Sequence, residues 1–207
     1  MHIVFVLLFC TVIGIVSGKS ITITKKNSSA PIHTLPFPNS VFQHKIRGNE
    51  TNETFVVFEA EYLNEGPGYH LHMKDDELFY IIDGNVQFIV NGSQFCASTG
   101  DYVYVPRFVS QVNGSQFCAS TGDYVYVPRF VSQGIRVYNP TNSTKPVKIQ
   151  IMLFPSGLDN FLDEIALIYN QDRTNSTAIN IISQKYGIIG LEPVQWKDLH
   201  CFEKTST

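Results

Sequence analysis

Two histidines and a glutamate are spaced so that their side chains can share one metal ion. His70 and His72 stand two residues apart in the segment 66–84, which reads GPGYHLHMKDDELFYIIDG. Side chains on a β-strand alternate between its two faces, so this spacing directs both imidazoles to the same side. Glu77 follows after the acidic break MKDD, which suits a turn or a strand end. Two imidazoles and one carboxylate, with open positions left over, suit Fe(II) and its first-row neighbours.

Two strands and a turn are needed to bring these three side chains together. The histidine strand is followed by residues 78–82, a bulky run with high β-propensity. Asp83-Gly84 then predicts a hairpin turn into a second apolar strand over residues 85–90. The sequence therefore predicts that the two histidines and Glu77 converge from two neighbouring strands.

The spacing of this segment resembles the first conserved motif of the cupin superfamily. In that motif a Gly-rich approach leads to His-x-His, then to Glu after three or four residues, and to Gly after six more. His70-Leu71-His72, Glu77 and Gly84 fit this pattern. The resemblance implies an all-β fold, the cupin double-stranded β-helix or jelly-roll barrel of a small cupin type 2 domain, with these three polar side chains facing its interior.

A later segment resembles the second cupin motif but departs from it at a metal ligand. Gln133 stands where the third His ligand is usual, and an amide oxygen is a poorer ligand than imidazole for these metals. The other matches and departures are Gly122 and Pro128, which fit, and Phe130 and Val137, which replace Gly and Asn. Two interpretations stay open. Either Fe, Mn, Cu or Ni is held by His70, His72 and Glu77 with help from Gln133, or the metal is lost and a polar pocket remains.

An identical repeat interrupts the barrel sequence. Residues 90–111 read VNGSQFCASTGDYVYVPRFVSQ, and residues 112–133 repeat them letter for letter. The repeat indicates either a very recent in-frame duplication or an error in the gene model. Because the barrel needs one copy, the other has to loop out, add strands at an edge or swap, and its β-prone apolar runs predict aggregation. We expect residue 90 onward to continue the first hairpin and residues 124–133 to lead into Gly134.

The first eighteen residues have the composition of a secretory signal peptide. Residues 3–16 are apolar but short for a membrane span, and Val16-Ser17-Gly18 offers small residues for cleavage. Seven Asn-x-Ser/Thr triplets agree with a secreted glycoprotein, and they begin at Asn27, Asn49, Asn52, Asn91, Asn113, Asn142 and Asn175. After the signal is removed three cysteines remain, Cys96, Cys118 and Cys201. A single copy of the repeat leaves two of them, which could form one disulfide.

Composition and periodicity indicate one domain made mostly of β-strands. The chain has 207 residues, a formal net charge of -3, 13% aromatic and 16% charged residues. This length allows one well-cored domain, and the mild acidity gives no support for nucleic-acid binding. We expect an irregular segment over residues 19–40, the barrel over 41–155 and a helical tail over 156–207. Strands of the barrel are expected at residues 41–46, 54–62, 85–90, 135–138 and 147–154.

Two helices are expected in the tail. Ser156-x-x-Asp159 predicts a capping box at the start of the first helix. Its apolar face is predicted to consist of Leu158, Phe161, Leu162, Ile165 and Leu167. The second helix is predicted over Thr177–Tyr186, ended by Gly187. This tail loosely resembles that of small cupins related to quercetin dioxygenases.

The remaining polar and aromatic candidates give weaker signals. Asp75 and Asp76 are interpreted as a solvated turn rather than as an acid/base pair. The three histidines outside the motif have no partners at ligand spacing and are interpreted as surface or structural residues, namely His33, His44 and His200. Tyr80 and Phe88 are candidate neighbours of the pocket.

Two functions of different classes follow. The resemblance implies a secreted, quercetinase-like dioxygenase in which the metal binds substrate or O2 and Glu77 doubles as a catalytic base. The alternative is a non-catalytic extracellular cupin that binds a small ligand, or serves storage or structure, without a metal. Both take a small molecule as partner, neither involves nucleic acid or a membrane span after signal removal, and the resemblance implies a homodimer.

Overall fold

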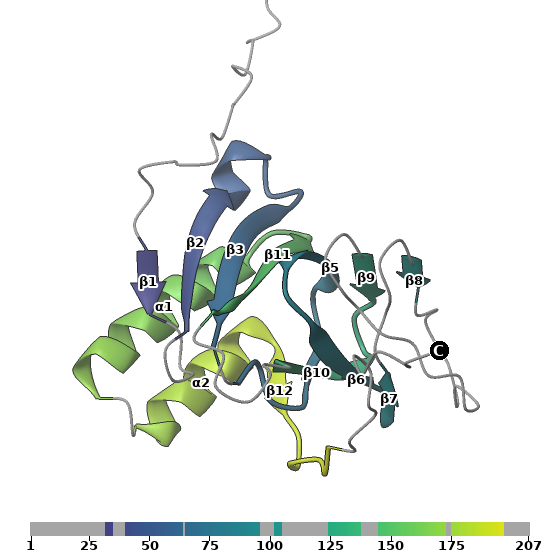
Figure 1. Cartoon of the computed structure of the whole chain (residues 1–207). Helices are drawn as coiled ribbons and strands as arrows, with labels where there is room; N and C mark the ends of the chain where they lie inside the picture. Colours follow the sequence, from purple (N-terminus) through teal and green to yellow (C-terminus); the bar gives the residue numbers. More distant parts are fainter. Residues whose placement is uncertain are drawn as a thin grey trace, which may run out of the picture.

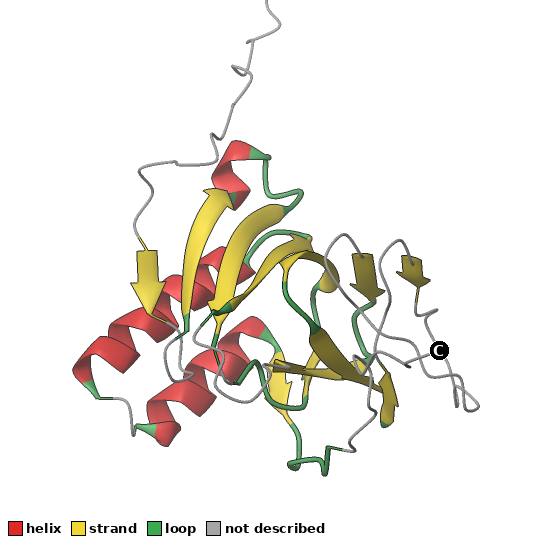
Figure 2. Cartoon of the chain, in the orientation of Figure 1, coloured by secondary structure: helices red, strands yellow, loops and turns green. Residues whose placement is uncertain are grey.

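Two β-sheets make up most of the fold, and two helices lie along one flank of them (Figure 1). The structure, a computed structural model, describes residues 32–34, 40–63, 65–95, 102–104, 124–137, 145–172 and 175–196. One sheet has the strand order β1-β2-β3-β11-β5-β9-β8 and the other the order β12-β4-β10-β6-β7. Neighbouring strands are antiparallel except for β8 and β9, which are parallel. Figure 2 shows the strands and helices of this arrangement in separate colours.

The elements have the following bounds. The strands are β1 (Ile32–Thr34), β2 (Val41–Ile46), β3 (Val56–Tyr62), β4 (His70–His72), β5 (Asp76–Asp83), β6 (Val86–Val90), β7 (Ser93–Phe95), β8 (Tyr102–Tyr104), β9 (Tyr124–Val127), β10 (Ser132–Val137), β11 (Val147–Phe154) and β12 (Ile188–Gly190). The helices are η1 (Gly48–Glu50), a single 3-10 turn, α1 (Leu158–Gln171) and α2 (Ser176–Tyr186). The predicted mostly-β fold with two helices near the C-terminus is confirmed.

The core forms where strands alternate buried and half-buried residues. In β11 the residues Val147, Ile149, Ile151 and Leu153 are buried, while those between them are half-buried. This period of two turns one face of the strand into the core, as the sequence predicts. β11 lies between β3 and β5, so its inward residues pack at the centre of the larger sheet.

The predicted hairpin at Asp83-Gly84 is wrong, although a turn does occur there. β5 belongs to the larger sheet, where it pairs with β11 and β9, whereas β6 belongs to the smaller sheet and pairs with β10 and β7. Gly84 has φ +94°, and Val147 Cγ2 lies 2.7 Å from the place a Cβ would occupy. The glycine therefore allows a close passage from one sheet to the other, and the turn does not fold β6 back onto β5.

The start of the first repeat copy and the end of the second copy form the strands that connect to the rest of the fold, as expected. Val90, the first residue of the first copy, ends β6, and the second copy supplies β9 and the start of β10, which runs unbroken into Gly134. β8 comes from the first copy and adds a strand at the edge of the larger sheet (Figure 1). It pairs with β9 so that equivalent residues of the two copies, such as Val103 and Val125, lie side by side. Of the options for the surplus copy, the described residues show an added edge strand.

Deleting one copy is expected to leave the barrel intact. A chain without residues 112–133 keeps the sequence of β6, β9 and β10, loses the surplus edge strand and shortens a long connection. Each halving of a loop's length lowers the entropic cost of closing it by roughly 0.6 kcal/mol. We therefore expect the free energy of unfolding to rise by about 1 kcal/mol in the one-copy chain. Thermal melting and size-exclusion chromatography of both chains test this. A lower melting temperature for the one-copy chain contradicts it.

The two C-terminal helices pack against each other and against the strands. The capping box predicted at the start of α1 is wrong: the N-cap is Gly157, which has no side chain to cap the helix. Ser156 instead donates to Glu53, and Asp159 accepts from the backbone N–H of Gly48. Leu167 is also not part of the apolar face, since it is 62% exposed. The second predicted helix is confirmed as α2, with Gly187 in the left-handed conformation at its end.

Several predictions fall outside the described part of the chain. These are the signal peptide, most of the segment 19–40, and the residues Cys96, Cys118, His200 and Cys201. Among the residues that are described, none of the helices combines the length and apolar character that crossing a bilayer requires.

Candidate metal site

Three donor atoms converge where the two sheets face each other. His70 and His72 lie on β4 of the smaller sheet, and Glu77 lies on β5 of the larger one. The Nε2 atoms of the two histidines are 3.0 Å apart, and His72 Nε2 is 3.2 Å from Glu77 Oε2. The prediction that these side chains meet is right, but they meet across the two sheets rather than from neighbouring strands. β12 and β10, on either side of β4, hold the histidines in place.

Both histidines have their second ring nitrogen directed at an oxygen atom. His70 Nδ1 donates to the carbonyl oxygen of Gly68 at 2.7 Å, and His72 Nδ1 faces Asp75 Oδ2 at 3.6 Å. Such outer partners fix the ring orientation and tautomer of metal-binding histidines. Because the Nδ1 atom of His70 is the donor, its Nε2 is left with a lone pair aimed at the centre of the cluster.

The electrostatics of the cluster concentrate one proton on His72. Removal from water lowers the pKa of His72, but the charges of Glu77 and Asp75 outweigh this and raise it to about 9. The pKa of His70 falls to about 4, because its ring is withdrawn from water and lies beside His72. At neutral pH the metal-free cluster thus holds a positive charge at His72 between two carboxylates, the place and sign of charge that a metal ion would take.

Gln133 joins the cluster from β10. Its backbone pairs with His70 in register, and its Nε2 donates to Glu77 Oε2 at 2.5 Å. The other amide atom, Oε1, is buried and has no hydrogen-bond partner. The structure therefore brings all four predicted residues together, with Gln133 positioned either as a donor to Glu77 or, after an amide flip, as an oxygen ligand.

Phe130 occupies the position where the resemblance expects a glycine, and its backbone has the conformation that favours glycine. Its φ is +66°, in the left-handed region that L-residues adopt at a cost of roughly 1–2 kcal/mol. Its side chain is 58% exposed. The turn between β9 and β10 therefore keeps the backbone shape that favours glycine, although the residue has changed.

The interpretation of Asp75 and Asp76 as a solvated turn is wrong. Both are buried. Asp76 Oδ1 accepts from the backbone N–H of Arg129 at 2.7 Å and from its Nε at 3.1 Å, while Oδ2 accepts from Nη2 at 3.1 Å. Asp75 faces His72. The acidic run is thus a buried support for the site, which the arginine from the β9–β10 turn compensates.

An apolar cavity of about 260 Å³ opens beside the cluster. Its polar residues include His70, His72 and Glu77. Its apolar lining comes from β3, β11, β12 and both helices and includes Phe58, Ile151, Leu162, Ile165, Ile179 and Ile188. Tyr80 and Phe88, expected near the pocket, do not line it: Phe88 packs on Phe79 in the core, and Tyr80 alternates with the inward residues of β5. Sequence analysis did not predict that the helices line the cavity, although the apolar face of α1 indicated that this helix packs against an apolar surface.

Spacing also gave no hint of a second group of polar side chains. His33 and His44, interpreted as unpartnered, lie with Asp163 of α1, and one ligand atom from each lies within 4.8 Å of the others. Asp163 is 119 residues from His44, so no local motif could connect them.

Residues 63–110 match the family model described as Cupin domain. The chain carries a cupin domain. The matched range includes His70-Leu71-His72, Glu77 and Gly84 and runs on through the first repeat copy. In the structure of this chain, however, β9 and Gln133 come from the second copy. The family match therefore covers the first repeat copy, whereas the candidate metal site uses the equivalent residues of the second copy.

Comparison with solved structures finds similar structures at low sequence identity. KdgF from Halomonas sp. is 12% identical, with 68% of this chain and 99% of that chain covered and a TM-score of 0.47. An RmlC-like cupin from Shewanella frigidimarina is 12% identical, with 69% and 99% covered and a TM-score of 0.46. A predicted oxalate decarboxylase from Thermotoga maritima is 14% identical, with 65% and 99% covered and a TM-score of 0.45. A search of curated proteins finds no match.

The side chains of this cupin fit a divalent transition metal. Two imidazole nitrogens and a carboxylate oxygen converge, the remaining ring nitrogens face oxygen atoms, and Gln133 Oε1 is an orphaned acceptor beside them. Imidazole and carboxylate together suit the first-row metals, among which these contacts do not select one.

Proposed function

We propose that this cupin binds one divalent transition metal, Fe, Mn, Cu or Ni, through His70, His72 and Glu77, and acts as a secreted dioxygenase on a compact apolar substrate. The observation that carries the proposal is the meeting of three donor atoms at the wall of an apolar cavity. The volume of about 260 Å³ lies at the small end for ligand sites, which favours a compact molecule.

The side chains divide the work between holding the metal, moving a proton and shaping the cavity. A bound transition metal would supply a Lewis-acid and redox centre with open positions. Glu77 is 6% exposed and lines the cavity, where its carboxylate can accept a proton from a substrate hydroxyl. The apolar side chains of β11, α1 and α2 exclude water and would orient a flat apolar substrate against the cluster.

A second function is favoured by the contacts of Gln133. Its amide already satisfies Glu77 Oε2, and the two histidines already contact each other, so the cluster is held together without a metal. These contacts support a non-catalytic extracellular cupin that binds a small ligand in the same cavity, or that serves storage or structure.

Secretion and glycosylation are part of the proposal. The apolar leader supports export. Four asparagines of the Asn-x-Ser/Thr triplets lie among the described residues, and all four are exposed: Asn49, Asn52, Asn91 and Asn175. An exposed side chain is what glycosylation requires. A homodimer is proposed from the cupin resemblance alone.

Metal content tests the site. The purified chain is expected to carry one equivalent of Fe, Mn, Cu or Ni at this site, which His72→Ala and Glu77→Gln both lose, since each removes a donor atom. Glu61→Gln is the matched control, because Glu61 pairs with Lys148 instead. Elemental analysis measures the metal, and circular dichroism shows that each variant is folded. Equal metal in the Glu77→Gln and Glu61→Gln variants overturns the site.

Oxygen uptake then separates the two functions. A metal-loaded chain that consumes O2 with flavonols or other small aromatic substrates supports the dioxygenase. A folded chain that takes up no O2 while binding such molecules supports the non-catalytic cupin.

A further inference from the structure

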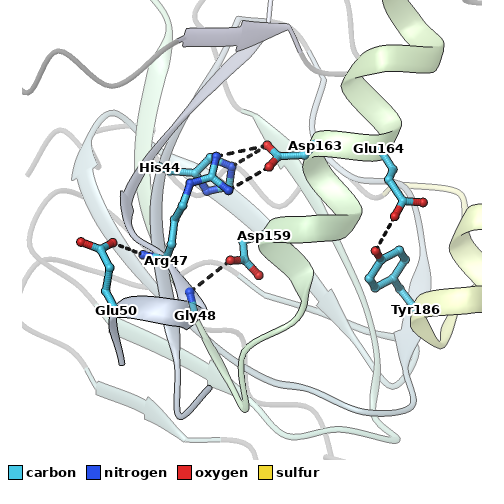
Figure 3. Close-up of polar contacts among 8 residues, drawn as sticks. All are labelled: His44, Arg47, Gly48, Glu50, Asp159, Asp163, Glu164 and Tyr186. Carbon is cyan, nitrogen blue, oxygen red and sulfur yellow. Dashed lines mark hydrogen bonds and ion pairs between the residues drawn. The ribbon is translucent and has the colours of Figure 1, made fainter. Parts of the chain in front are cut away.

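A second group of ligand-type side chains lies where β1, β2 and α1 meet. His33 on β1 pairs in register with Phe42 on β2, and His44 follows two residues later on the same face of β2. The His33 ring stacks on Phe42 at 4.9 Å and meets His44 edge-on at 5.8 Å. Figure 3 shows Asp163, which comes from α1, pointing toward His44 and Arg47. Two consecutive N-terminal strands and a helix more than 100 residues later in the chain thus direct polar side chains to one point.

The distances suit shared coordination. His44 Nε2 lies 3.0 Å from Asp163 Oδ1, and one ligand atom from each of His33, His44 and Asp163 lies within 4.8 Å of the others. Ligand atoms around tetrahedral zinc are roughly 3.4 Å apart, as bond lengths of about 2.0–2.2 Å require. The widest gap therefore has to close by at most about 1.4 Å, and a turn of the half-buried His33 ring is the movement that would close it.

An ion pair alone leaves part of this cluster unexplained. Arg47 donates to Asp163 through both guanidinium nitrogens, from Nη1 to Oδ2 at 2.8 Å and from Nη2 to Oδ1 at 3.4 Å, so the carboxylate is oriented. In contrast, His33 Nε2 and His44 Nδ1 are buried and have no hydrogen-bond partner. Buried polar atoms almost always find a partner, so the orphaned Nε2 of His33 indicates a missing ligand. His44 would bind the same ligand through Nε2, the nitrogen that faces Asp163 Oδ1. A metal-bound carboxylate is typically held by an outer partner, the position that Arg47 occupies.

The charge balance also allows a cation. Arg47 contributes one positive charge, while Asp163 and the buried Asp159, one helical turn earlier, contribute two negative ones. Asp159 Oδ2 accepts from the backbone N–H of Gly48, and its Oδ1 has no partner (Figure 3). The cluster is thus negative overall when both histidines are neutral.

We propose that His33, His44 and Asp163 bind a zinc ion that fastens β1 and α1 to β2. Two imidazoles and a carboxylate are a ligand set for Zn²⁺, with water in the fourth position. The site is separate from the cluster around His72, and it does not depend on the proposed dioxygenase activity. The ion would join a short N-terminal strand to a C-terminal helix and keep its fourth position open to water.

Zinc retention tests this site in a chain whose first site has been removed. The parent is the full chain with His70→Gln and His72→Gln, to which Zn²⁺ alone is added before dialysis. We expect one zinc per chain in this parent. Adding His33→Gln or Asp163→Asn is expected to weaken zinc binding at least tenfold. Glu164→Gln is the matched control, since the neighbouring Glu164 binds Lys185 and Tyr186 and should retain the zinc.

Melting temperatures give a second readout. Zinc is expected to raise the melting temperature of the parent and of the Glu164→Gln chain, and to leave that of the His33→Gln chain unchanged. If Asp163→Asn fails to fold, His33→Gln still decides, because His33 takes no part in the ion pair between Asp163 and Arg47. Equal zinc affinity in the parent and in the His33→Gln chain overturns the proposal, as does a folded parent that retains no zinc.

Discussion

A histidine in place of Gln133 is expected to tighten transition-metal binding by at least the roughly 10–100-fold that outer partners of metal ligands contribute. Gln133 is 2% exposed and lies in β10, where its backbone pairs with His70. An imidazole reaches about as far from the backbone as the amide does, so its Nε2 can approach Glu77 and the two histidines. The change removes the orphaned Oε1 and adds a third neutral nitrogen, a better ligand for these metals.

The dissociation constant for Mn²⁺ or Ni²⁺, from competition with a chelator, measures this effect. Gln87→His is the matched control, because Gln87 is also a buried glutamine of the smaller sheet but contacts Gln94. It adds the same number of histidines and is expected to leave the affinity unchanged. An unchanged affinity in the Gln133→His chain means that the metal is not bound between His70, His72 and Glu77.

Ile149→Ala is expected to destabilise the fold by about 2–5 kcal/mol, the range for removing a large aliphatic side chain from a core. Ile149 is fully buried in β11, and its register partners, Ala60 of β3 and Ile81 of β5, are fully buried as well. No polar contact is lost, so the cost comes from the cavity and from the apolar surface returned to water. Each kcal/mol corresponds to a fall in melting temperature of roughly 2–4 °C for a chain of this size.

Gln150→Ala is the matched control for this prediction. Gln150 is the next residue of the same strand and is half-buried on the opposite face. We expect a change within about 0.5 kcal/mol, as for most surface substitutions. Urea unfolding of both variants gives the free energies, and similar losses in the two would mean that the core does not lie on the Ile149 side of β11.

Local spacing was enough to predict which polar residues gather at the candidate metal site, but not which strands carry them together. Two residues of separation place His70 and His72 on one face, and this holds in any sheet. The pairing of each strand depends on contacts with distant segments. The turn at Gly84 was predictable from its residue types, but the choice of β10 as partner for β6 was not, because it depends on how the two sheets pack.

Charged residues show the same limit. Asp76 follows Asp75 in a polar run, which usually indicates a solvated turn, yet Arg129 lies 53 residues away and supplies three hydrogen bonds to it. His44 and Asp163 are farther apart still. A side chain that finds its partner through the fold has no signature in its own neighbourhood of the sequence.

The parallel pairing of β8 with β9 has an evolutionary consequence. The two strands have the same sequence but face unequal selection, since β9 lies inside the sheet, with Val125 fully buried, while β8 is its outermost strand. Substitutions in β8 should accumulate more readily than those in β9. Two copies under such different constraint drift apart over time, and they are still identical at every position. Their identity indicates either a very recent duplication or an error in the gene model. A true duplication is expected to show its first differences among relatives in β8.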